Sequence, residues 1–134
     1  MKPSTIPTED EEQANLFAWA TIAKARHPEL ALLYAIPNGG KRPMSVAVRM
    51  KRTGTKAGVP DMFLPVARGG CHGLYIELKR SKGGRVSPEQ TAWMHALTEQ
   101  GYRCAVCHGW TQARLEILDY MQILPRELSG GDTP

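Results

Sequence analysis

Residues 58–79 read GVPDMFLPVARGGCHGLYIELK, and this stretch decides the fold. It holds two mostly apolar runs, which predict neighbouring β-strands at residues 61–66 and 73–78, joined by a turn at residues 67–72. If the two strands pair as a hairpin, the acids Asp61 and Glu77 come close together at one edge of it. Side chains alternate along a strand, so Glu77 and Lys79 point to the same face.

Outward from this stretch, helix and strand patterns alternate along the chain. The expected elements are a helix capped by Thr8, a strand at 30–36, a basic helix at 43–52, the two strands above, a helix from Ser87 to residue 100, a strand at 102–107 and a final helix at 111–124. The order α-β-α-β-β-α-β-α predicts a single α/β domain, with a mixed sheet covered by helices on both faces.

Composition narrows the class of protein. The chain has 134 residues, of which 42% are hydrophobic, and this suits one domain with its own core. The segments 1–7 and 126–134 are rich in Pro, Ser and Gly and are expected to be flexible ends. No apolar run is long enough to span a bilayer, and the N-terminus has an acidic cluster where a signal peptide would be cationic and then apolar. The sequence therefore predicts a cytoplasmic protein.

Charge is distributed unevenly, although the formal net charge is only +4. Residues 31–60 contain cations and no Asp or Glu; the cations are Lys41, Arg42, Arg49, Lys51, Arg52 and Lys56. A second basic run after the strand at 73–78 includes Arg80 and Lys82. Such surfaces either are solvated faces or bind phosphates, and we interpret these eight cations as candidate DNA contacts.

The acids of residues 58–79 suggest metal chemistry. Two adjacent carboxylates repel each other unless a divalent cation lies between them, and oxygen ligands of this kind suit Mg²⁺ or Mn²⁺. Lys79 could position an attacking water or stabilise charge on a phosphoryl transition state. Glu-x-Lys alone is weak evidence, because the same triplet can be a surface ion pair.

Several blocks together resemble a known family. Pro60-Asp61, a strand and then Glu77-Leu78-Lys79 have the form of the PD-(D/E)xK nuclease signature. The wider set resembles the VRR-NUC domain in the short stand-alone form of phages and bacteria: Glu9-x-x-x-Gln13, PNGG at 37–40, GVPD at 58–61, GLYIELK at 73–79 and SPEQ at 87–90. The resemblance extends over about residues 8–120.

The resemblance implies a restriction-endonuclease-like core and a role for individual residues. Asp61 and Glu77 would bind Mg²⁺ or Mn²⁺ together with the backbone carbonyl of Leu78, and Lys79 would be the catalytic lysine. Three further residues are implied in the site: Glu9 as a metal-binding carboxylate, Asn38 near the scissile phosphate, and Gln90 facing the same cleft. Each of these three also has a structural interpretation, as a first-turn acid, a turn residue and a helix cap.

The resemblance also implies partners. The family's substrates are branched DNA, such as four-way junctions or flaps, and its short members resemble homodimers. Apolar residues near the basic helix (Met44, Val46, Val48) or towards the final helix (Trp110, Leu115, Ile117) could form a dimer interface, or they could belong to the core. A DNA-binding module without catalysis is the alternative function, but a pure binder gains nothing from acids beside phosphate.

The motif Cys104-Ala105-Val106-Cys107-His108 fits the C-x-x-C-H pattern of covalent haem. Here it falls in a predicted strand, where the two cysteines face opposite sides and cannot share an ion. A structural zinc site would need a second well-spaced pair of ligands. We therefore expect neither haem nor structural zinc.

Overall fold

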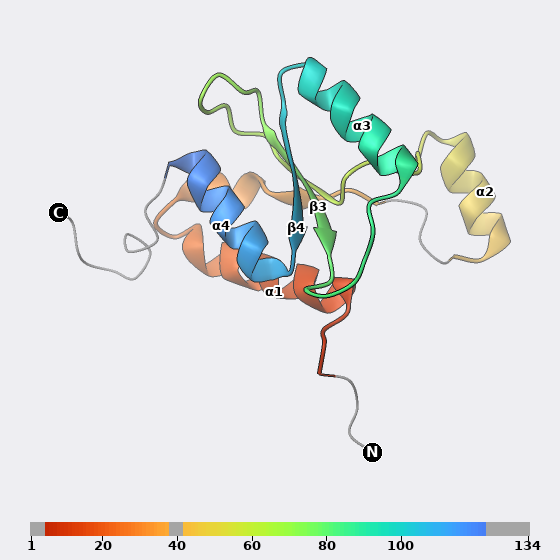
Figure 1. The fold of residues 1–134 in the computed structure, drawn as a ribbon, viewed down its shortest axis with the longest axis horizontal. Coiled ribbons are helices and arrows are strands. Elements are labelled where there is room, and N and C mark those ends of the chain that lie inside the picture. The colour runs from red at the N-terminus through yellow and green to blue at the C-terminus, as the bar shows by residue number, and fades with distance from the viewer. Residues whose placement is uncertain (1–4, 38–41, 123–134) are drawn as a thin grey trace.

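The computed structural model describes residues 5–37 and 42–122 (Figure 1). Its elements are α1 (Glu9–Ala23), the 3₁₀-helix η1 (Pro28–Leu32), β1 (Tyr34–Ala35), α2 (Met44–Arg52), β2 (Met62–Leu64), β3 (Leu74–Lys79), α3 (Pro88–Glu99), β4 (Arg103–His108) and α4 (Trp110–Met121). The predicted α/β class and the order of helices and strands are confirmed. Both predicted capping boxes are present, at Thr8 for α1 and at Ser87 for α3.

The four strands form one mixed sheet in the order β1-β2-β3-β4. β2 pairs with β3 antiparallel, with Met62 opposite Ile76, so the predicted hairpin forms. β3 and β4 run parallel, which requires a crossover connection, and α3 provides it. This arrangement brings the C-terminal end of β3 to the middle of the sheet, flanked by β2 on one side and β4 on the other.

The two faces of the sheet differ in character. α1 and α4 lie together on one face (Figure 1), where Leu74, Ile76 and Leu78 of β3 are buried against side chains such as Leu16 and Ile117. Because side chains alternate along β3, Glu77 and Lys79 point to the other face, toward α3. The apolar side of β3 therefore anchors the strand in the core while its polar side is presented to α3.

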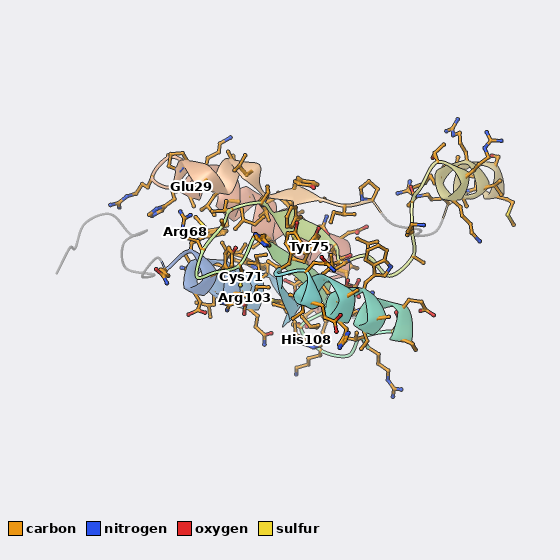
Figure 2. All side chains as sticks on the ribbon, turned by 90° about the horizontal axis from the view of Figure 1, so that it is seen from above. Glu29, Arg68, Cys71, Tyr75, Arg103 and His108 are labelled. Carbon is orange, nitrogen blue, oxygen red and sulfur yellow. The ribbon has the colours of Figure 1, made fainter. Side chains whose placement is uncertain are left out.

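The first predicted strand, at residues 30–36, is wrong over most of its length. Residues 28–32 form η1, and only Tyr34–Ala35 pair with β2. Pro28 suits the first turn of a helix, and Leu30 and Leu33, the buried residues here, are three positions apart, which is a helical spacing. Arg68 joins Glu29 in an ion pair at 3.0 Å, which ties η1 to the connection between β2 and β3 (Figure 2).

The strand predicted at residues 61–66 is shorter in the structure. β2 ends at Leu64, because Pro65 has no amide hydrogen to donate to a neighbouring strand. The chain then turns, and the Val66 amide donates to the Leu64 carbonyl at 2.9 Å. Val66 is nevertheless buried, and its carbonyl accepts a hydrogen bond from the Tyr120 hydroxyl of α4.

α2 stands apart from the rest of the fold in both views (Figures 1 and 2). None of its side chains is buried, and Met44 and Val48 are 79% and 56% exposed. Met44 and Val48 thus have no covering layer within the described chain, whereas Val46 and Met50 are partly buried. No helix within residues 5–37 or 42–122 has the length and apolarity to cross a bilayer.

Candidate active site

Asp61 and Glu77 meet where β2 begins and β3 is about to end. The antiparallel register places Asp61 opposite Glu77, one position beyond the pair Met62 and Ile76. Asp61 Oδ2 accepts a hydrogen bond from the Leu78 amide at 2.7 Å, which fixes this carboxylate against β3. Glu77 is only 1% exposed and Lys79 6%. The sequence prediction that these acids come together is therefore realised in the fold.

Gln90 connects the acid and the lysine. Its Nε2 donates to Glu77 Oε2 at 2.9 Å, and its Oε1 accepts from Lys79 Nζ at 3.0 Å. Lys79 Nζ also lies 3.4 Å from Glu77 Oε2. The same Gln90 Oε1 accepts from the Ser87 amide at 2.8 Å, closing the capping box of α3. Gln90 thus caps the helix and contacts two candidate catalytic groups with one amide.

Burial makes the acidic pair unusual. The pKa of Glu77 is raised to about 8. Burial is the largest cause, followed by the charge of Asp61 and a hydrogen bond between the two side chains. Lys79 acts in the opposite direction and lowers the pKa. In addition, Glu77 Oε1 is buried without a hydrogen-bond partner. A negatively charged Glu77 is therefore poorly compensated by the described protein groups alone.

This donor set fits a divalent cation. A cation beside the pair would neutralise two adjacent carboxylates and give Glu77 Oε1 the partner it lacks. Oxygen donors of this kind are those preferred by Mg²⁺ and Mn²⁺. Among the described residues, no group of three or more His, Cys, Asp or Glu side chains converges as a metal cage, so Asp61 and Glu77 stand as a pair.

Gly58 explains why the loop before β2 can approach α3. Its φ is +92°, in the region that favours glycine, and a Cβ at this position would lie 2.8 Å from the Cβ of Glu89. The loop therefore packs directly on the first turn of α3, with Pro60 buried next to Asp61. In this way the GVPD segment sets the start of β2 against the helix that carries Gln90.

α1 contributes a different acid to the interior from the one singled out in the sequence. Glu9 is exposed in the first turn of α1, and its role in metal binding stays a prediction. The buried acid is Glu12, 4% exposed, whose Oε1 accepts from the Trp110 amide at the start of α4 at 3.0 Å. Glu12 lies four positions before Leu16 on one helix face, and this spacing was the signal of its burial.

Of the other predicted site residues, most are cations on or beside α2, and two lie outside the described chain. Asn38 and Lys41 fall outside the described residues. Six of the predicted DNA contacts are exposed: Arg42, Arg49, Lys51, Arg52, Lys56 and Lys82. Arg80 is partly buried, and its Nε donates to the Pro7 carbonyl at 3.4 Å. Five of these cations, from Arg42 to Lys56, therefore lie on or beside α2.

The cysteine motif lies on β4. Cys104 and Cys107 occupy positions of opposite direction along the strand, and both are free thiols. Burial raises the pKa of Cys107 to about 12, so its thiol stays protonated. His108, which sequence reasoning did not assign to the site, pairs in register with Lys79, and its Nδ1 lies 3.1 Å from the Arg80 carbonyl.

Comparison with known proteins agrees with this geometry. The VRR-NUC domain matches residues 10–111 of the chain. A solved structure of a VRR_NUC domain protein is similar, with a TM-score of 0.74 and 30% sequence identity, over 88% of this chain and 91% of that one. None of the curated proteins matches the chain. The match spans more than half of the sequence and includes Asp61, Glu77, Lys79 and Gln90, and the chain therefore belongs to the VRR-NUC family of nuclease domains.

Proposed function

We propose that this nuclease domain is a DNA endonuclease that depends on Mg²⁺ or Mn²⁺. Its active site, formed by Asp61, Glu77 and Lys79, would hydrolyse phosphodiester bonds. The observation that carries the proposal is the buried Glu77, whose Oε1 has no partner and whose neighbour is a second carboxylate. A site that only bound DNA would be weakened by acids held next to phosphate. These acids are better explained as ligands for a cation that takes part in hydrolysis.

Asp61, Glu77 and the Leu78 carbonyl would hold the metal. The Leu78 amide faces Asp61, and in a strand the amide and carbonyl of one residue point to the same side, so this carbonyl is directed toward the same side as the acid. A bound metal would supply Lewis acidity and a more acidic water. A further carboxylate from Glu9 is part of the proposal, although Glu9 is exposed in the structure.

Lys79 would act on the phosphate and the attacking water. Its ammonium is held by Gln90 Oε1 and lies beside Glu77, so its position is fixed before substrate arrives. A fixed cation at this place would stabilise the negative charge that builds up on the phosphate oxygens as water attacks phosphorus and the P–O bond to the leaving strand breaks. Because preorganised charges need no rearrangement during the reaction, the Gln90 contacts support this role.

One assay tests the proposed activity. The purified chain should cut DNA in Mg²⁺ or Mn²⁺ but not in EDTA, and Asp61→Asn prepared in parallel should be inactive. The substrates are duplex, single-stranded, flap and four-way-junction DNA of matched sequence. We expect the branched molecules to be cut fastest. Metal-dependent binding without any cutting would favour the alternative of a non-catalytic DNA-binding module.

The cations of α2 are proposed to contact the DNA backbone, and this gives a separate prediction. Lys51→Glu with Arg52→Glu should weaken binding to DNA of any sequence and flatten its dependence on salt. Both side chains are exposed, and each lost phosphate contact should reduce the log–log salt slope by about one unit. Fluorescence anisotropy at several salt concentrations measures the slope.

Lys24→Glu with Arg26→Glu is the matched control for this experiment. It makes the same change in net charge after the end of α1, at exposed positions on the side of the molecule away from α2 (Figure 1). Its salt slope should stay close to that of the unmodified protein. Equal slopes for all three proteins would show that α2 faces away from the nucleic acid.

We also propose that the chain works as a symmetric homodimer, since two cuts across a four-way junction need two sites related by a twofold axis. The exposed Met44 and Val48 of α2 support this proposal, because one face of α2 then finds a covering surface on a second copy. Ile117 is fully buried, so it belongs to the core instead. Leu115 is 47% exposed and marks the competing surface on α4.

The dimer makes a prediction for light scattering. The unmodified protein should have the mass of two chains, and Met44→Glu with Val48→Glu should have the mass of one while keeping the same circular dichroism spectrum. Burying carboxylates in an apolar interface is strongly unfavourable, whereas both positions are open to water in the single chain. Leu115→Glu is the control and should remain dimeric. A mass of one chain for the unmodified protein over a tenfold concentration range would contradict the dimer.

A further inference from the structure

A cavity of about 420 Å³ lies between the loop before β2, the end of β1 and α3. We call it the inner cavity: Ile36, Val59 and Trp93 form its apolar wall, and Thr55 and Lys56 are among its polar lining. Its volume is within the range of small-molecule sites, roughly 300–1,000 Å³. Trp93 is only partly buried, so an aromatic ring system borders this space.

The inner cavity adjoins the candidate active site through three of its elements. The Ile36 amide donates to the Asp61 carbonyl at 2.8 Å. Val59 precedes Asp61 by two residues. Trp93 lies one helical turn after Gln90, whose amide contacts both Glu77 and Lys79. The lining of the inner cavity is therefore joined to Asp61 through the backbone and to Gln90 through α3.

A second cavity of about 490 Å³ lies beside α2. We call it the basic cavity: Arg42, Lys51 and Lys56 line it, and it shares Thr55 and Lys56 with the inner cavity. None of the described residues lining either cavity is acidic. Cations without acids form a surface for phosphate, so the two cavities combine an aromatic compartment with a phosphate-binding one.

We propose that the inner cavity receives one unpaired nucleobase of the DNA strand that is cut, with the adjoining phosphates on the cations of the basic cavity. The proposal rests on the proposed nuclease function and names its substrate more closely. A paired base is stacked between its neighbours and cannot reach Trp93, whereas an unpaired base is free to leave the duplex and stack on the indole. The preferred substrate class is therefore DNA with an unpaired nucleotide beside the scissile phosphate.

The test asks whether Trp93 contacts the unpaired base. Two substrates share one sequence with a single unpaired nucleotide at the cut site, but one of them lacks the base at that nucleotide. For the unmodified protein, removing the base should lower kcat/KM about tenfold, the effect expected for loss of one base–aromatic stack. For Trp93→Ala the two substrates should be cut at similar rates, since the partner of the base is already gone.

Two controls separate stacking from loss of fold. Trp93→Phe keeps an aromatic ring and should retain most of the discrimination between the two substrates. His95→Ala changes an exposed residue of the same helix and should behave as the unmodified protein. An equal loss on base removal in the unmodified protein and in Trp93→Ala would overturn the proposal.

A binding measurement tests whether the base enters the inner cavity independently of DNA cleavage. With 2-aminopurine as the unpaired base and EDTA present, binding by the unmodified protein should quench the fluorescence by stacking, and binding by Trp93→Ala should quench it much less. Equal quenching would overturn the inner-cavity proposal even if DNA is cut. Failure to cut any DNA in Mg²⁺ or Mn²⁺ would instead remove the nuclease proposal, and the quenching result would still decide whether a base enters the cavity.

Discussion

Asp61→Asn, Glu77→Gln and Lys79→Ala should each lower the rate of DNA cleavage by at least about 10²–10³-fold, the usual effect of removing one preorganised group from a transition state. Asp61 and Glu77 are the adjacent carboxylates proposed as metal ligands, and Lys79 is the cation held beside them by Gln90. Single-turnover cleavage of a four-way junction in Mg²⁺ measures the effect on the chemical step.

The three variants should still fold and bind DNA. Glu77→Gln keeps the size of the side chain and replaces a carboxylate that is costly to charge, so its structure should be preserved. Circular dichroism and DNA binding in EDTA check this. Because the groups act together, the double variant Asp61→Asn with Glu77→Gln should lose little more than either single variant. Near-normal cleavage by Asp61→Asn, with contaminating nuclease excluded, would show that the site is elsewhere.

The second large effect concerns stability without metal, where the free energy of unfolding should fall as pH rises from about 5 to about 8. The pKa of Glu77 is raised to about 8 in the folded chain, above its value in the unfolded chain. Between these two values the folded state keeps a proton that the unfolded state has lost, so raising the pH favours unfolding. This single group contributes at most about 1.4 kcal/mol per pH unit in that window. Below the unfolded pKa the contribution is constant.

Urea unfolding in EDTA at pH 5, 6, 7 and 8 measures this dependence. Other groups also titrate in this range, so the relevant quantity is the difference between the unmodified protein and Glu77→Gln, which should grow in favour of the variant as pH rises. Mg²⁺ or Mn²⁺ should restore stability at pH 8 in the unmodified protein, by about 2.7 kcal/mol at a hundred times the dissociation constant. Parallel stability curves for the two proteins would contradict the assigned environment of Glu77.

The sequence predicts the hairpin and the meeting of Asp61 with Glu77 because both depend on local patterns. Strand alternation and the turn at residues 67–72 determine that Glu77 and Lys79 share a face and that Asp61 lies opposite Glu77. The capping box at Ser87 likewise predicted the start of α3. Patterns of this kind extend over a few residues, and they succeeded where the structure depends on a few residues.

Other features depend on contacts between distant segments. Four consecutive acids begin α1, and the spacing from Leu16 places Glu12 on the inner face, but its hydrogen-bond partner, the Trp110 amide, comes from the distant N-terminus of α4. The inner cavity forms where the end of β1, the loop before β2 and α3 meet, and no single segment of the sequence predicts it. η1 was misread because Leu30 to Ile36 is too short an apolar run for periodicity to separate a strand from a helical turn.

The double contact of Gln90 ties local folding to reactivity. Glutamate serves as well as glutamine at this position of a capping box and would also suit the positive end of the helix dipole. In this chain, however, Gln90→Glu would place a third carboxylate against Glu77 and would replace the amide that donates to it with an acceptor. A change that helps the helix would thus harm the acid pair. The two properties share one side chain, so neither selection nor protein engineering can improve them independently at position 90.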